Sequence, residues 1–255
     1  MIGRDFPDLK GGALDGGGGL ELSFASYNIR KAVGLDRKRD PERILAVLHE
    51  INADVVALQE CDRRLGPRAS VLPRQLLEEF HWQIAPVALR SSSIGWHGNA
   101  LLVRRGIDIL DAAPITLPNL EPRGAVRADL LVDGSPIRVA GMHLDLSGIR
   151  RRHQVRTILD HLGHPDSEPA PAVLMGDLNE WSRKGGAFRE FGDGWQISEP
   201  GRSFPAHQPV ARLDRIVASR EWEMIDARVH HSALSARASD HLPVVARLRL
   251  ASRPD

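Results

Sequence analysis

The chain of 255 residues is 42% hydrophobic and 26% charged, and its 34 lysines and arginines against 33 aspartates and glutamates leave a formal net charge of +1. This composition is that of a globular protein and excludes a disordered, collagen-like or disulfide-framework chain, while the near-neutral total gives no global field that would steer it onto a polyanion. The single cysteine, Cys61, excludes an internal disulfide and a cysteine-rich zinc site.

The N-terminal segment, residues 1–20, ends in a run of glycines and has no apolar core of the kind that a secretory signal needs. We expect it to be a flexible leader without a chemical role. No segment approaches the ~20 apolar residues of a membrane-spanning helix, so a cytoplasmic location is the default expectation. Without an internal repeat or a long linker, residues 21–251 are expected to form a single domain, followed by a tail at 252–255.

The first predicted elements are a strand, a helix, a strand and a helix. Apolar and polar residues alternate over 20–29, which indicates a half-buried strand. A helix is predicted over 41–50, because Asp40 is a favoured N-cap and proline is favoured at the first helical position. The apolar run 55–58 predicts a buried strand, and a second helix is predicted over 73–80.

Further along, turn signals separate a series of predicted strands. They are expected at 81–88, 99–104, 107–116, 124–132 and 136–144. A basic helix over about 148–162 follows, with Ser147 as its cap. Later strands are predicted at 172–175 and near 211–218, 223–231 and 243–250. Many strands and few helices predict one mixed α/β domain.

Several polar residues lie where a predicted strand meets a loop, either near the end of the strand or, as for Asp240 and His241, just before it. They are Asn28, Glu60, His143, Asp177, Asn179, Asp214, Asp240 and His241. For each alone, turn capping or a satisfied hydrogen bond is the commoner role, but buried strands that each release a polar residue at one edge can converge on a cleft. The oxygen donors of Asn28, Glu60 and Asp240 suit a hard cation such as Mg²⁺, and an Asp–His pair suits general-base chemistry.

Seven short motifs run through the chain in order from Asn28 to His241. They are Tyr27–Arg30, Leu58–Glu60, Gly98–Leu102, His143–Leu144, Gly176–Asn179, Leu213–Ile216 and Ser239–Pro243. Each is weak alone, but together they resemble the ordered motifs of the endonuclease/exonuclease/phosphatase superfamily, which has a DNase I-like fold. The resemblance implies an α/β (α+β) fold. This is a four-layer α/β sandwich with two mixed β-sheets packed face to face, helices outside and the active site at one end.

The resemblance also implies a metal site. Glu60 would be the main ligand, with Asn28 and Asp240 completing or supporting the shell around Mg²⁺, for which Mn²⁺ could substitute. Asn99 would brace the site without reacting. The single-residue alternatives are turn residues for the asparagines and a capping carboxylate for Glu60.

The other motif residues are implied to act on the phosphate and on water. Asp214 would accept a hydrogen bond from His241, and the two lie on either side of a predicted hairpin. His241 would then deprotonate water or, once charged, hold a phosphate oxygen, and Asp177 is the rival for orienting the water. Asn179 and His143 would bind the non-bridging oxygens, where charge gathers in the transition state.

The motifs indicate the reaction more clearly than the substrate. Superfamily members that cleave at abasic sites usually have tyrosines where this chain has His143 and Arg215, and the only tyrosine here is Tyr27. This difference argues against abasic-site repair. Arg30 and Arg123 are the candidate contacts to substrate phosphates.

Taken together, the resemblance implies a divalent-metal-dependent phosphoesterase, foremost a phosphodiesterase with endonuclease-like, metal-assisted attack of water. The alternative is a lipid-headgroup or small-molecule phosphoesterase, of the inositol or sphingomyelin type, with peripheral membrane contact. A third interpretation is a non-catalytic relative that binds phosphate. The partner would be a nucleic acid, lipid or small-molecule phosphoester, and no obligate protein partner is evident.

Overall fold

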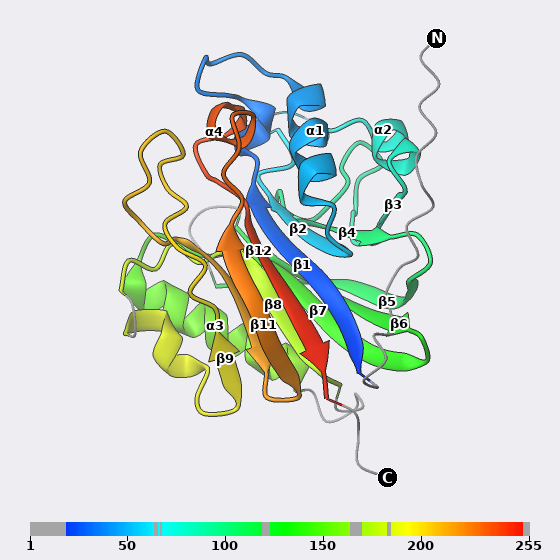
Figure 1. Cartoon of the computed structure of the whole chain (residues 1–255), viewed down its shortest axis with the longest axis vertical. Helices are drawn as coiled ribbons and strands as arrows, with labels where there is room; N and C mark the ends of the chain where they lie inside the picture. The colour runs from blue at the N-terminus through cyan, green and yellow to red at the C-terminus, as the bar shows by residue number, and fades with distance from the viewer. Residues whose placement is uncertain are drawn as a thin grey trace.

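Two β-sheets of six strands each pack face to face in the computed structural model (Figure 1). The structure describes residues 19–63, 66, 68–118, 123–163, 170–182 and 185–251. Residues 1–18 of the expected leader and the expected tail at 252–255 lie outside the described residues. Among the described helices, none combines the length and the apolar character needed to cross a membrane.

The first sheet has the strand order β11-β12-β1-β2-β4-β3. Its strands are β1 (Leu20–Asn28), β2 (Val55–Gln59), β3 (Trp82–Ile84), β4 (Ala100–Arg104), β11 (Trp222–Val229) and β12 (Val244–Leu250). β1 runs parallel to β2 and antiparallel to β12. The carboxyl ends of β1 and β2 therefore lie at the same edge as the amino end of β12.

The second sheet, of order β5-β6-β7-β8-β10-β9, repeats this arrangement. Its strands are β5 (Asp108–Ile115), β6 (Ala125–Val132), β7 (Ser135–His143), β8 (Ala172–Asp177), β9 (Trp195–Ile197) and β10 (Asp214–Ser219). β7 runs parallel to β8, and β8 runs antiparallel to β10. The ends of β7 and β8 and the start of β10 thus share one edge as well.

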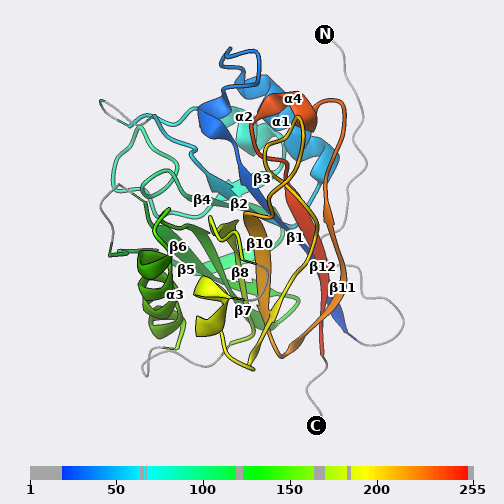
Figure 2. The same ribbon diagram turned by 90° about the vertical axis from the view of Figure 1, so that its left-hand side faces the viewer.

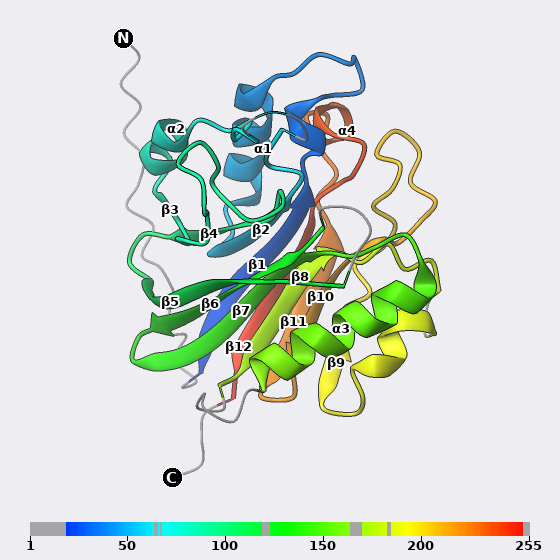
Figure 3. The ribbon, with the colours of Figure 1, turned by 180° about the vertical axis from the view of Figure 1, so that it is seen from behind.

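Helices cover the outer faces of both sheets, which gives the expected four layers. The helices are α1 (Pro41–Ile51), α2 (Arg74–Glu79), α3 (Gly148–Leu162) and α4 (Ser235–Ala238), and 3₁₀ turns lie at η1 (Arg30–Ala32) and η2 (Gly186–Glu190). Apolar residues of α1 pack on β1 and β2, and those of α3 pack on β7 and β8. Figure 2 shows α3 outside the second sheet, and Figure 3 shows it from behind. The largest apolar cluster fills the space between the sheets.

Local sequence explains the start of α1 but only part of α3. The Asp40 carboxylate accepts a hydrogen bond from the backbone nitrogen of Arg43 at 3.1 Å, and Pro41 occupies the first turn, as predicted. Ser147 does occupy the N-cap of α3, but its side chain makes no capping hydrogen bond. The backbone nitrogen of Ser147 instead donates to Asp145 Oδ1 at 2.8 Å.

The predicted hairpin between Asp214 and His241 is wrong. β10 and β11 follow one another closely in sequence, yet β10 pairs with β8 and β9 in the second sheet, whereas β11 pairs with β12 in the first. Adjacent strands usually pair, and β11 does pair with the next strand, β12, but β10 pairs with the preceding β9 and with β8, further back in the chain. The chain therefore crosses from one sheet to the other between these two residues.

Several element bounds also differ from the prediction. β3 covers only Trp82–Ile84 of the expected 81–88, and β10 begins at Asp214, later than the expected 211. β9 and α4, of three and four residues, were not predicted. Elements this short carry too few residues for a periodic pattern to be read.

Candidate active site

These polar residues, some at the ends of strands and others at or before their starts, gather at one end of the sandwich, where the two sheets meet. Asn28, Glu60, Asp240 and His241 come from strand ends of the first sheet, and His143, Asp177, Asn179 and Asp214 come from those of the second. Two hydrogen bonds between these residues join the sheets directly. Asn28 Nδ2 donates to Asp177 Oδ2 at 3.1 Å, and His241 Nδ1 lies 2.9 Å from Asp214 Oδ2.

Asp177, at the end of β8, lies at the centre of this cluster and is only 2% exposed. Its Oδ1 accepts a hydrogen bond from the backbone nitrogen of Asn179 at 3.0 Å. Its Oδ2, which accepts the Asn28 amide, also lies 3.4 Å from His143 Nε2 and 3.7 Å from His241 Nε2. Donors from both sheets therefore hold this carboxylate in a fixed orientation.

Asp214 and His241 form a buried pair across the sheet junction, 27 residues apart in sequence. Ser203 Oγ also donates to Asp214 Oδ2, at 2.5 Å, and the Phe204 ring lies 4.7 Å from the imidazole, centroid to centroid. Because Nδ1 of His241 faces Asp214, its Nε2 is left facing Asp177. The pair thus fixes the orientation of the ring, as a carboxylate does for a histidine in many active sites.

The pKa values of the two site histidines are shifted in opposite directions, so that one ring is charged and the other is neutral. Burial alone would lower the pKa of His241, but the charges of Asp214, Asp177 and Asp240 outweigh it and raise that pKa from 6.5 to about 10. Burial lowers the pKa of His143 to about 3, because the attraction of Asp177 is offset by Arg123, by His241 and by Lys31. At neutral pH, His241 is an imidazolium and His143 is a neutral ring.

We expect NMR of histidine ring nitrogens at pH 7 to show this contrast directly. His241 should give the spectrum of a charged ring with two N–H groups, and His143 that of a neutral ring protonated at Nε2, facing Asp177. His143→Gln and His241→Gln variants assign the signals. Ordinary titration of both rings near pH 6.5 would contradict the electrostatic account.

The three residues implied as metal ligands surround the turn that follows β1. The Glu60 carboxylate pairs with the Lys31 ammonium, and Asp240 Oδ2 lies 3.2 Å from Arg30 Nε. Asn28 Oδ1 accepts a hydrogen bond from the backbone nitrogen of Arg30 at 3.1 Å. The Glu60 and Asp240 side chains are 27% and 29% exposed, so an ion from solvent can reach them. Glu60 and Asp240 offer carboxylate oxygens, both of which attract cationic groups here, and Asn28 offers an amide oxygen. Oxygen ligands of this kind fit a divalent cation such as Mg²⁺.

A second group of residues could also hold a metal ion. Ligand atoms of Asp177, Asp214 and His241, all buried, lie within 4.8 Å of one another. In this structure, however, a charged His241 already supplies a positive group to both carboxylates. The cluster therefore has the features of an acid–base group as well as those of a metal site.

The remaining predicted residues lie around this centre. Asn99 is fully buried, its Nδ2 donates to the Trp96 carbonyl at 3.3 Å, and its Oδ1 has no partner among the described residues. The preceding Gly98 accepts a hydrogen bond from Cys61, next to Glu60, at 2.9 Å. The turn that Asn99 closes therefore packs against the Glu60 backbone.

Two further predicted residues converge on one backbone carbonyl beside His143. Arg123 Nη1 and Asn179 Nδ2 donate to the carbonyl oxygen of Leu144, at 2.5 and 3.0 Å. Asn179 has a positive φ of 49°, a conformation that asparagine tolerates better than most residues. The arrangement keeps both side chains next to the His143–Asp177 contact.

Sequence reasoning missed three residues of this site. Ser203 and Phe204, which contact the Asp214–His241 pair, lie in a loop without a motif, so no local signal points to them. Lys31 directly follows the Tyr27–Arg30 motif, and its ion pair with Glu60 depends on the conformation of the turn. The signals available for it were its position next to a motif and its place in the basic pair Arg30–Lys31.

Comparisons with known proteins find matches both in sequence and in fold. The sequence model described as "Endonuclease/Exonuclease/phosphatase family" matches residues 25–241. The uncharacterized protein YbhP of Escherichia coli K12 is 28% identical over 169 residues, 61% of this chain and 64% of YbhP, so the match spans less than two thirds of that relative.

Solved structures with under 25% identity share the fold. The mannosyl-6-phosphatase of Bacteroides thetaiotaomicron has a TM-score of 0.68 and 18% identity, covering 89% of this chain and 99% of its own. D. rerio TDP2 complexed with a single-strand DNA product has a TM-score of 0.67 and 16% identity, covering 89% and 98%. One protein with this fold is thus a mannosyl-6-phosphatase, and another was solved in complex with a single-strand DNA product.

Proposed function

Because the chain belongs to the endonuclease/exonuclease/phosphatase family, whose members are metal-dependent phosphoesterases or nucleases, we propose that it is a Mg²⁺-dependent phosphodiesterase that hydrolyses its substrate by attack of water. The main support is the junction of the two sheets. There the Asp214–His241 pair faces Asp177, with Glu60 and Asp240 beside the adjoining turn.

Glu60, Asn28 and Asp240 would hold the metal ion. When bound, it supplies positive charge that stabilises the charge developing on the phosphoryl group or on the leaving oxygen. Partial exposure of both carboxylates suits Mg²⁺, which usually keeps several of its waters. Mn²⁺, which also favours oxygen ligands, should substitute for it.

The phosphate would be held by three groups at the end of the second sheet and its junction with the first. The charged His241 and the neutral His143, whose Nε2 atoms face Asp177 in the free protein, would share their Nε2–H groups with the phosphate, and Asn179 offers an amide. One positive charge and two neutral donors suit a monoanionic diester better than a dianionic monoester. This balance of charge favours a diester substrate.

We assign to Asp177 the role of accepting a proton from the attacking water. A charged His241 has no lone pair to accept a proton, whereas the Asp177 carboxylate lies between both histidines and can accept one. The water oxygen forms its bond to phosphorus as its proton passes to Asp177. The phosphorus–oxygen bond to the leaving group breaks on the opposite side.

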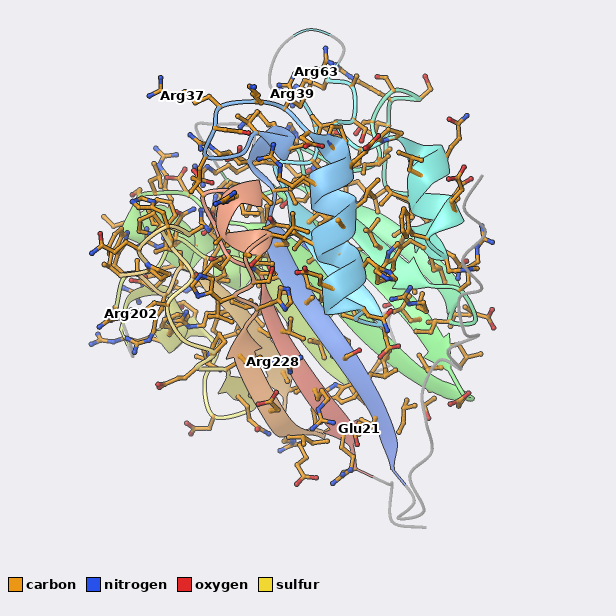
Figure 4. All side chains as sticks on the ribbon, turned by 45° about the horizontal axis from the view of Figure 1, so that its top comes forward. Glu21, Arg37, Arg39, Arg63, Arg202 and Arg228 are labelled. Atoms are coloured by element: carbon orange, nitrogen blue, oxygen red, sulfur yellow. The ribbon has the colours of Figure 1, made fainter. Side chains whose placement is uncertain are left out.

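Exposed cations occur at the same end of the molecule. Arg37 and Arg39 lie in the loop between η1 and α1, and Arg39 Nε donates to the Lys31 carbonyl at 3.1 Å. Figure 4 shows Arg37, Arg39 and Arg63 toward one end and Glu21, at the start of β1, toward the other. An anionic substrate would therefore meet arginines as it approaches the site.

A panel of phosphoesters tests this proposal. With Mg²⁺ present, we expect a higher kcat/KM on bis-p-nitrophenyl phosphate than on p-nitrophenyl phosphate, for the charge reason given above. DNA, RNA and phospholipid vesicles in the same panel separate a nuclease from a lipid-headgroup enzyme. Asp177→Asn serves as the background control.

Two outcomes would change the proposal. A higher efficiency on the monoester would favour a phosphatase over a phosphodiesterase. No turnover above the Asp177→Asn background on any substrate would leave a non-catalytic phosphate-binding protein.

A further inference from the structure

The turn that follows β1 has an uncommon backbone. Arg30, Lys31 and Ala32 have φ values of 44°, 56° and 58°, so three consecutive residues other than glycine are left-handed. Each such residue has a steric cost, because its Cβ approaches the following carbonyl oxygen. A conformation of this kind persists only where the surrounding structure enforces it, and it concentrates at functional sites.

Backbone hydrogen bonds to the neighbouring strand enforce the turn. The backbone nitrogen of Lys31 donates to the Glu60 carbonyl at 3.1 Å, and that of Ile29 donates to the Gln59 carbonyl at 3.1 Å. Arg30 is bonded through its own nitrogen to Asn28 Oδ1. These bonds hold two consecutive basic residues against the end of β2.

Both basic side chains meet the proposed metal ligands. The Lys31 ammonium pairs with Glu60 Oε2, and the Arg30 guanidinium pairs with Asp240 Oδ2. Lys31 is one of only four lysines in a chain with 34 basic residues. A lysine ammonium is a compact point charge, so it is closer in form to a metal cation than the planar guanidinium of arginine.

We propose that Lys31 is an internal counter-ion of Glu60 which a divalent cation must displace, so that this turn sets the metal affinity of the site. The inference rests on the proposed function, because it takes Glu60 as a metal ligand. Arg30 acts in the same way on Asp240. In the absence of metal, the two cations neutralise the carboxylates, and on metal binding they must leave the oxygens that they contact.

Two physical effects weaken metal binding in the presence of Lys31, and they act in the same direction. The ion bound at Glu60 must first break the Lys31–Glu60 pair. It then experiences repulsion from an ammonium that the turn keeps nearby. Removing the ammonium should therefore tighten metal binding, whereas a lysine that only contacts substrate would leave metal binding unchanged.

Calorimetric titration of the whole protein with Mn²⁺ measures this effect without any substrate. We expect Lys31→Met to bind Mn²⁺ about 5- to 10-fold more tightly than the wild type, as expected for loss of a partly exposed ion pair and of charge repulsion. Lys38→Met is the matched control, because Lys38 is an exposed lysine of the loop that follows this turn. Its dissociation constant should stay within about twofold of the wild type.

A second measurement needs no variant. With four lysines, the ammonium signals of the wild type can be resolved by NMR. We expect the Lys31 ammonium to exchange slowly in chelator, and its signal to be lost when Mg²⁺ saturates the site.

The outcomes separate this inference from the proposed function. Unchanged or weaker Mn²⁺ binding by Lys31→Met, or an ammonium signal that Mg²⁺ leaves unaltered, overturns the counter-ion role while a metal-dependent enzyme remains. A wild-type protein that binds neither Mn²⁺ nor Mg²⁺ overturns both.

Discussion

Replacing Asp214 with asparagine is expected to lower kcat by ~10²–10³-fold, the usual range for loss of one electrostatic contact to the charge that develops on the phosphate. Asp214 is fully buried and contacts His241 Nδ1 at 2.9 Å, so its charge both orients the ring and keeps it protonated. Asparagine preserves the shape but removes the charge. Metal affinity, measured by Mn²⁺ titration, should be unchanged, because Asp214 contacts none of the proposed ligands.

The partner variants show whether the two residues act as one unit. His241→Ala should lose at least as much rate as Asp214→Asn, and the double variant should be little worse than His241→Ala alone, since residues that act together give non-additive losses. Ser203→Ala is the matched control, because it removes a neutral donor to the same carboxylate oxygen. Additive losses would mean that Asp214 and His241 act separately.

The pH dependence of the rate identifies the form of His241 that acts. Its pKa is raised from 6.5 to about 10, so the charged ring persists through neutral pH and is lost as the pH passes about 10. If the charged ring holds phosphate, activity falls on the alkaline side. Asp214→Asn should move that fall to lower pH, because the negative charge that most raises the pKa is gone. If the neutral ring were the base, activity would instead rise toward the same pH.

Glu60→Gln is expected to abolish most metal-dependent turnover. Glutamine keeps the length of the side chain but offers a neutral oxygen, so Mn²⁺ affinity should fall by more than the ~10–100-fold typical of residues that only support a metal ligand. The rate at limiting Mg²⁺ should fall with it. Calorimetry and the rate as a function of Mg²⁺ concentration measure the two effects.

The matched control for Glu60→Gln is Glu42→Gln, an exposed glutamate in the first turn of α1. It should change neither affinity nor rate. Unchanged metal binding in Glu60→Gln would exclude Glu60 as the main ligand. If Asp177→Asn lost metal binding instead, the ion would belong to the buried cluster of Asp177, Asp214 and His241.

The sequence predicted the fold class and the candidate residues through features that are local. Asp40 and Pro41 mark the start of α1, and short apolar runs ending in Glu60 and Asp177 mark two buried strands. Each sheet has a parallel pair of strands, so residues that end those strands must share an edge. The candidate residues were recognised as a set because their motifs occur in the order typical of the family.

Features that depend on long-range pairing were not predictable in this way. Whether β10 pairs with β11 or with β8 is decided by partners far along the chain, which is why the hairpin prediction was wrong. The Ser203 contact to Asp214 and the ion pair between Lys31 and Glu60 arise from loop conformation. The opposite pKa shifts of His143 and His241 depend on burial and on charges from both sheets.

The most direct test of a metal-dependent phosphodiesterase is the hydrolysis of bis-p-nitrophenyl phosphate by the wild-type protein, first in excess chelator and then with Mg²⁺ restored. We expect no turnover above the Asp177→Asn background in chelator, and recovery of the rate as Mg²⁺ saturates the site, because we propose that the carboxylates of Glu60 and Asp240 bind the cation. Full activity in excess chelator would contradict the account.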